Sequence, residues 1–177
     1  MKDIIRLLIP MVAASILVGC GKKEPTTDIW TAAATGNVDA VREHVSFGTD
    51  LDSREPGNGS TPLIVASLYG QTEVMKILVE NGANLDLQNN QGSTALHTAA
   101  FVCQPEAVTF LLEKGANAEL KNNYGRTALE AVSGEWNSEI EGRYTQIAAA
   151  LQLNLDLNRI KAARPQVAEI LRQHNAL

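Results

Sequence analysis

The sequence has little of what most enzymes and small disulfide-rich domains depend on. Its 177 residues include two cysteines, which cannot build a disulfide framework, and three histidines that lie far apart. None of the patterns His-Glu-x-x-His, Gly-x-Ser-x-Gly or the phosphate-binding loop occurs. We therefore expect no enzymatic activity, no cofactor and no bound metal ion.

Positive charge and aromatic rings are also scarce. Lys and Arg total 15 against 20 for Asp and Glu, a net charge of −5, which argues against a phosphate-binding face and a nucleic-acid partner. Aromatic residues make up 5% of the chain, so large rings cannot dominate its core. A hydrophobic fraction of 45% and a charged fraction of 20% are still typical of a folded globular chain.

The first twenty residues differ from the rest of the chain. Fourteen of them are hydrophobic, and Lys2 and Arg6 supply a positive start. The uncharged run over residues 7–19 is too short for a transmembrane helix, which needs about 20 apolar residues. A positive start followed by a short apolar run is typical of a secretory signal.

The end of this run, Leu17-Val18-Gly19-Cys20, resembles the lipobox of bacterial lipoproteins. The resemblance implies cleavage between Gly19 and Cys20 and attachment of acyl chains, such as palmitate, to Cys20. Two or more chains anchor a protein stably to a membrane. The other interpretation is a free cysteine at the end of an ordinary signal.

On this interpretation residues 1–19 form the signal peptide, and residues 20–27 form the lipidated end and a short polar tether. Gly21 stands where an Asp often retains enterobacterial lipoproteins at the inner membrane. By the same resemblance, we expect a bacterial envelope protein on the outer membrane, facing the periplasm.

Two phrases recur in the remaining sequence at a fixed period. Gly-Ser-Thr-Pro-Leu at residues 59–63 returns 33 residues later as Gly-Ser-Thr-Ala-Leu, and again at residues 125–129 as Gly-Arg-Thr-Ala-Leu. Gly-Ala-Asn at residues 82–84 also returns after 33 residues. The period divides the chain into repeats at about 27–58, 59–91, 92–124, 125–151 with an extension, and a degenerate helical cap at 152–177.

The period and the runs over residues 61–66 and 94–99 resemble the ankyrin repeat, whose signature is Thr-Pro-Leu-His-x-Ala. The resemblance implies an all-α solenoid over residues 28–177, made of stacked helix-turn-helix pairs with hairpin-like loops and an atypical helical C-terminal cap. It also implies a protein–protein interaction module.

Local chemistry agrees with such pairs. Thr61 is suited to cap a first helix that begins with Pro62, and Gly70 is suited to a left-handed turn before the second helix. Gly82 then ends that second helix in the same way. In the next repeat Cys103 replaces the inter-helix glycine, so we expect an altered turn there.

The C-terminal part departs from the pattern. Ile140, Tyr144 and Ile147 form one helical stripe, and residues 154–158 are predicted to interrupt it. A last stripe follows, in which we expect Pro165 to kink or split the helix and Asn175 to replace the capping glycine.

Several residues are apolar where the resemblance implies exposure, or lie near loop tips that the family uses for binding. Aromatic residues and Arg are also enriched in binding hot spots. The candidates for protein binding are Leu68, Tyr69, Phe101, Val102, Tyr124, Arg126 and Trp136. The alternative is that these side chains pack against the C-terminal extension, which is favoured for Trp136.

Three functions follow from this interpretation. The first is a lipid-anchored module that binds an unknown protein partner. The second is an immunity or inhibitor protein that blocks a toxin or envelope enzyme, with acidic charge suited to a basic target. The third is a small-molecule-binding or enzymatic site in the extension after Val132, which no residue pattern supports.

Overall fold

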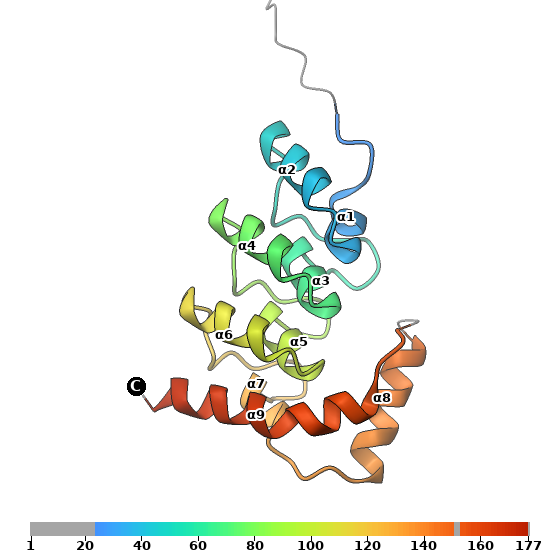
Figure 1. Ribbon diagram of the computed structural model, residues 1–177, viewed down its shortest axis with the longest axis vertical. Helices are drawn as coiled ribbons and strands as arrows, with labels where there is room; N and C mark the ends of the chain where they lie inside the picture. The colour runs from blue at the N-terminus through green and yellow to red at the C-terminus, as the bar shows by residue number, and fades with distance from the viewer. Residues whose placement is uncertain (1–23, 151–152, 177) are drawn as a thin grey trace, which may run out of the picture.

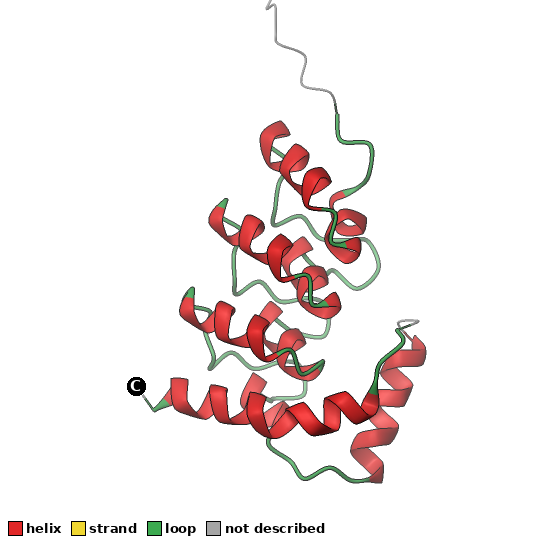
Figure 2. Cartoon of the chain, in the orientation of Figure 1, coloured by secondary structure: helices red, strands yellow, loops and turns green. Residues whose placement is uncertain are grey.

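The computed structural model describes residues 24–150 and 153–176 (Figure 1). Within these ranges every regular element is a helix (Figure 2). The signal peptide, Cys20 and the first part of the tether lie outside the described residues. None of the described helices is long and apolar enough to cross a bilayer.

The first six helices form three pairs that stack on one another. The first helices pack in a row, α1 on α3 and α3 on α5, and the second helices follow beside them (Figure 1). The sequence repeat is therefore a structural repeat, and the predicted all-α solenoid is confirmed. The pairs are α1 (Ile29–Thr35) with α2 (Val38–Phe47), α3 (Pro62–Tyr69) with α4 (Thr72–Glu80), and α5 (Ala95–Phe101) with α6 (Pro105–Glu113).

Small side chains allow the first helices to approach closely. Ala32, Ala66 and Ala99 occupy equivalent places on α1, α3 and α5, and all three are fully buried. Larger side chains such as Leu78 and Leu111 fill the space beside the second helices. Since one pair alone cannot bury these faces, the stack supplies the core.

The predicted helix ends are found. The Thr61 hydroxyl accepts a hydrogen bond from the Ile64 amide at 3.3 Å, and Pro62 is the first residue of α3. Gly70 ends α3 in a left-handed conformation with φ 67°. Gly82, with φ 92°, follows the last turn of α4.

The turn at Cys103, which we expected to be altered, differs little from the turn of the preceding repeat. Cys103 has φ 51° and is the one non-glycine residue with positive φ in the described part of the chain. The Gln104 amide donates to the Ala99 carbonyl at 3.0 Å, as the Gln71 amide donates to Ala66 at 2.9 Å in the preceding repeat. The turn thus keeps its backbone path without a glycine, and α5 is one residue shorter than α3.

The last three helices are α7 (Ala128–Val132), α8 (Ser138–Ala150) and α9 (Leu157–Asn175). α7 packs on α5, and α9 packs on both α6 and α7. α7 and α9 therefore form the last helix pair, shared by the ranges 125–151 and 152–177, with α8 inserted between them. α8 rises beside the stack (Figure 1).

The predicted interruption is found at residues 153–156, but its end, a split at Pro165 and the capping role of Asn175 are wrong. α9 starts at Leu157, inside the predicted interruption, and Asp156 caps it. It runs unbroken through Pro165, because buried Ile160 and Val167 hold both halves in the core. Asn175 is still helical and donates from its side-chain amide to Glu119 at 3.0 Å.

Candidate interaction groove

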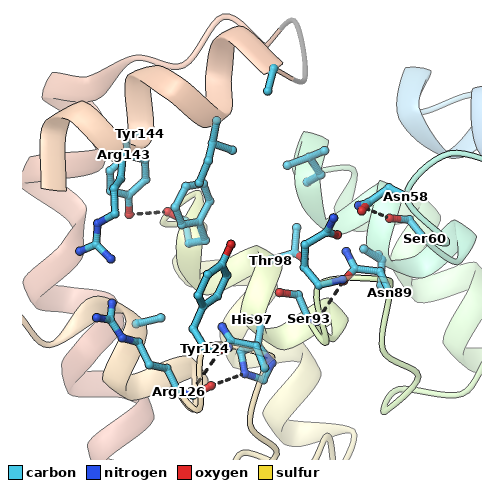
Figure 3. A pocket seen from close by; sticks show the side chains of 18 of the residues that line it. Asn58, Ser60, Asn89, Ser93, His97, Thr98, Tyr124, Arg126, Arg143 and Tyr144 are labelled. Atoms are coloured by element: carbon cyan, nitrogen blue, oxygen red, sulfur yellow. Dashed lines mark hydrogen bonds between the residues drawn. The ribbon is translucent and has the colours of Figure 1, made fainter. Parts of the chain in front are cut away.

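A groove of about 580 Å³ lies between the first helices of the stack and α8. One side carries residues of α3, α5 and the loop tips, and the other side is α8. Figure 3 shows Tyr124, Arg126 and His97 on the loop side and Arg143 and Tyr144 on the α8 side. We call it the α8 groove. Its volume falls within the range of about 300–1,000 Å³ found for ligand sites.

Tyr144 fixes α8 in place. Its ring stacks on Phe101, with centroids 4.3 Å apart, and on Trp136, with centroids 5.4 Å apart. Its hydroxyl donates to the Phe101 carbonyl at 2.7 Å and accepts from Arg164 Nη1 at 3.1 Å. Burial raises the pKa of this hydroxyl far above its usual value, so Tyr144 stays protonated as a structural donor.

Two arginines of α9, Arg159 and Arg164, also hold the end of α5 and the loop before α8 in place. Arg159 donates to the carbonyls of Cys103 at 3.0 Å and Val102 at 2.9 Å, which lie just beyond the end of α5. Helix C-termini have unpaired carbonyls and favour cations. Arg164 donates to the Gly134 carbonyl at 3.1 Å, and its guanidinium carbon lies 5.9 Å from the centre of the Trp136 ring.

The loop side of the groove is held by Asn122 and His97. The Asn122 side-chain oxygen accepts from the amides of Tyr124 at 3.0 Å and Arg126 at 3.2 Å. His97 Nε2 lies 3.0 Å from the Arg126 carbonyl, and its Nδ1 accepts from the Thr94 amide at 3.4 Å. This arrangement requires a neutral ring with the proton on Nε2. Burial lowers the pKa of His97, which favours the neutral form.

The predicted contact residues do not all lie at one site in the structure. Leu68, Phe101, Tyr124 and Arg126 line the α8 groove. Tyr124 has 77% of its surface exposed, whereas Phe101 is half-buried under Tyr144. Tyr69, 46% exposed, lines an adjoining hollow that also contains Trp30.

Two of the predicted contact residues serve packing. Val102 is only 1% exposed, so its prediction as a contact residue is wrong. Its side chain belongs to the core because the left-handed turn at Cys103 follows it and α9 covers that end of α5. Trp136 is half-buried against Tyr144, and its indole nitrogen donates to Glu141 at 3.3 Å.

Sequence reasoning missed the residues that α8 and α9 contribute to the groove. Arg143 and Ile147 are exposed and line it from α8, and buried Arg164 lines it from α9. The stripe of Ile140, Tyr144 and Ile147 was visible in the sequence. The spacing of Arg143 and Ile147, four residues apart and so on one helix face, was the further signal.

The charge of the groove is opposite to that of the whole chain. Its charged lining residues are Arg126, Arg143 and Arg164, and the described residues that line it include no Asp or Glu. No group of three or more metal-binding side chains is found in residues 24–150 and 153–176. The arrangement is suited to binding an anionic, partly apolar ligand.

Comparisons with known proteins agree with this architecture. Ankyrin repeat-containing protein P1E11.10 of Schizosaccharomyces pombe is 36% identical over 64 residues, covering 36% of this chain and 30% of that protein. The human DNA-binding protein RFXANK is 40% identical over 52 residues, covering 29% of this chain and 20% of that protein. The chain thus spans less than a third of each relative.

A solved structure and a family model carry the assignment further. The ankyrin repeat domain of Bcl-3, a member of the IkappaB protein family, superposes with a TM-score of 0.56 and 30% identity, over 58% of this chain and 45% of that one. The family described as ankyrin repeats (3 copies) matches residues 29–122 and 81–140. Since these matches cover more than half of the chain, it belongs to the ankyrin-repeat family.

Proposed function

We propose that this chain is a lipid-anchored protein of a bacterial cell envelope, whose repeat stack binds a protein partner through the α8 groove. Ankyrin repeats indicate a protein–protein interaction module. The observation that carries the proposal is the groove itself, because it combines the exposed Tyr124 and Arg126 with an apolar floor and has room for a partner's side chains.

The partner is tested in cells by placing a photo-crosslinking amino acid in the full chain. At Tyr124 we expect an adduct with a specific envelope protein. The matched control is Phe47 on α2, which is 42% exposed at the far end of the stack and should give no such adduct. Equal labelling at both positions would contradict binding through the groove.

The anchor rests on the lipobox resemblance of residues 17–20. Feeding cells an alkyne analogue of palmitate should label the chain, and Cys20→Ser should lose both the label and membrane association. Cys103→Ser is the matched control, because Cys103 is buried in the stack and should leave labelling unchanged. Labelling that survives Cys20→Ser would overturn the anchor.

Placement on the outer membrane rests on Gly21 alone. Membranes separated on a density gradient should contain the protein in the outer-membrane fraction. Gly21→Asp should move it to the inner membrane where the enterobacterial rule applies. Inner-membrane localisation of the unaltered chain would contradict this part of the proposal.

The other two functions find less support. The inhibitor hypothesis relied on acidic charge that meets a basic target, but the charged side chains in the groove are arginines. The enzymatic hypothesis needs a reactive group. Burial raises the pKa of the Cys103 thiol, as it does for Tyr144, so both stay protonated and are poor nucleophiles at neutral pH.

A further inference from the structure

We infer that the α8 groove takes an extended segment of the partner in which carboxylates lie at the α8 end and large apolar side chains follow toward Trp30. This inference rests on the proposed function and identifies the chemistry of the partner. It depends on three observations: the local excess of arginine, a buried guanidinium without an acidic partner, and the continuity of the groove along the stack.

The arginines form a local exception on an acidic protein. The chain has a net charge of −5, yet the groove is lined by Arg126 from a loop tip and Arg143 from α8, both exposed. Clefts lined by one sign of charge focus the field and attract ligands of the opposite sign. Arg126 and Arg143 come from different elements, a loop tip and α8, so the positive charge of the groove is not confined to one helix.

Arg164, on α9, adds a third and buried positive charge to the lining of the α8 groove. Arg164 is only 5% exposed, and its hydrogen-bond partners are the Tyr144 hydroxyl and the Gly134 carbonyl, which are both uncharged. The two salt bridges found in the described residues, Lys76–Glu73 and Arg172–Glu169, do not involve it. Burying a charge without a countercharge costs free energy. An anion bound in the groove would therefore be attracted by Arg164 and would in turn stabilise the folded chain.

The floor between these charges is apolar. Phe101, Ile147 and Leu68 present carbon surface that is only partly covered by neighbouring side chains. Half-buried aromatic and aliphatic side chains of this kind are suited to receive apolar anchors. A ligand with carboxylates alone would leave this part of the groove unused.

The groove continues past Leu68 into the hollow lined by Trp30 and Tyr69, since both share Asn58, Ser60, Val65 and Leu68. This continuity favours an extended segment over a small anion, which would occupy one end only. The charged residue that lines the far hollow is Glu55. The change from arginine to glutamate along the path sets the direction of the segment, with carboxylates near α8.

The test uses a display library of random peptides selected on the purified full chain. We expect the selected peptides to be enriched in Asp or Glu followed by large apolar residues. Arg143→Glu and Arg126→Glu should each weaken their binding by about tenfold or more, because like charges then face each other. The matched control is Arg42→Glu on α2, an exposed arginine remote from the groove, which should bind as the unaltered chain does.

Direction is tested with the same peptides carrying a photo-crosslinker at either end. The acidic end should link to α8, and the apolar end to the neighbourhood of Tyr69. Increasing salt should weaken binding, since exposed charges are screened within about 10 Å at 0.1 M ionic strength. Arg143 and Arg126 are exposed side chains, so both variants should fold, which urea unfolding checks.

The possible failures can be told apart. Selected peptides without acidic enrichment, or equal binding by the Arg143→Glu and Arg42→Glu chains, would overturn the inference and leave the interaction module in place. Binding of inorganic phosphate or free glutamate as tightly as the peptides would also overturn it, in favour of a small-anion site. If no peptide binds and no envelope protein crosslinks at Tyr124, the proposed function falls as well.

Discussion

At two junctions of the stack, a carbonyl near the end of a first helix accepts a side-chain hydrogen bond, but the donors differ. Between the first and second repeats, Gly36 takes a left-handed conformation with φ 69°, and Gln71 donates from its side-chain amide to the Ala34 carbonyl at 3.0 Å. At the junction between the third repeat and α8, which we call the far junction, Cys103 is left-handed, and Tyr144 donates to the Phe101 carbonyl. Ala34 and Phe101 each lie two residues before the left-handed residue.

The difference shows how an insertion can replace a regular contact. Gln71 belongs to the next repeat and supplies one amide, whereas Tyr144 belongs to α8 and adds a buried ring and a link to Arg164. Arg159 covers the two following carbonyls. The far junction therefore holds α8 beside the stack, and the α8 groove is a consequence of that attachment.

The largest effect is expected when the ring that makes this junction is removed. Tyr144→Ala should lower the free energy of unfolding by about 3–5 kcal/mol, because it deletes a side chain that is 2% exposed between two rings. Urea unfolding measures the change. Tyr124→Ala is the control, and since Tyr124 is 77% exposed it should change stability by less than about 0.5 kcal/mol. Similar losses for both would show that Tyr144 is not the anchor.

The hydrogen bonds of the two junctions are compared directly by Tyr144→Phe and Gln71→Ala. Tyr144→Phe should cost about 1–3 kcal/mol, because it leaves Arg164 Nη1 without a partner in a buried place and leaves the Phe101 carbonyl with only the weak Cys103 thiol donor at 3.8 Å. Gln71→Ala should cost about 1 kcal/mol, since water reaches its half-buried surroundings. If Gln71→Ala proved the costlier change in urea unfolding, the regular junction would be the stronger one.

The left-handed residues offer a smaller contrast. Gly70→Ala should destabilise by about 1–2 kcal/mol, since an L-residue with φ 67° is strained. The added carbon would lie 2.8 Å from Gln104 Nε2, a flexible end that can move away. Cys103→Gly relieves the same strain but loses a buried sulfur, so its net effect should stay within about 1 kcal/mol. A large loss for Cys103→Gly would mean that the thiol, not the backbone, determines the turn.

The regular junctions could be predicted from the sequence because their determinants are local. Thr61 and Pro62 start a helix and Gly70 ends it within a few residues, and the period repeats these signals. The contacts of Tyr144 with Phe101 and of Arg159 with Val102 join residues more than forty positions apart. Nothing in the local pattern predicts such pairs.

The same reason explains why the sequence pointed to some of the residues that line the groove but not to the groove itself. Tyr124 and Arg126 lie on loop tips whose place follows from the repeat, and both line the groove. Arg143 and Ile147 depend on how α8 is docked, and that docking depends on Tyr144. Pro165 predicted an interruption by local rules, but packing on both sides of it keeps α9 continuous.

The smallest expected effect is a pH dependence that comes from the regular part of the stack. Burial lowers the pKa of His97 from its usual value of 6.5, so the unfolded chain binds this proton more tightly than the folded chain. The free energy of unfolding should therefore be at its full value above pH 6.5, fall as the pH drops through this value, and level off below the folded pKa. Protonation would also remove the Nδ1 acceptor that holds the Thr94 amide.

Urea unfolding at several pH values between 8 and 5 measures this slope. His97→Gln should be less stable at pH 8 and should lose the part of the slope that His97 supplies, whereas Tyr144→Phe should keep it. The expected separation follows from position, because His97 joins one loop to the next through the Arg126 carbonyl while Tyr144 joins the stack to α8. A slope that disappears in Tyr144→Phe would instead mean that the two junctions are coupled, and that α8 stabilises the loop side of the groove as well as its own.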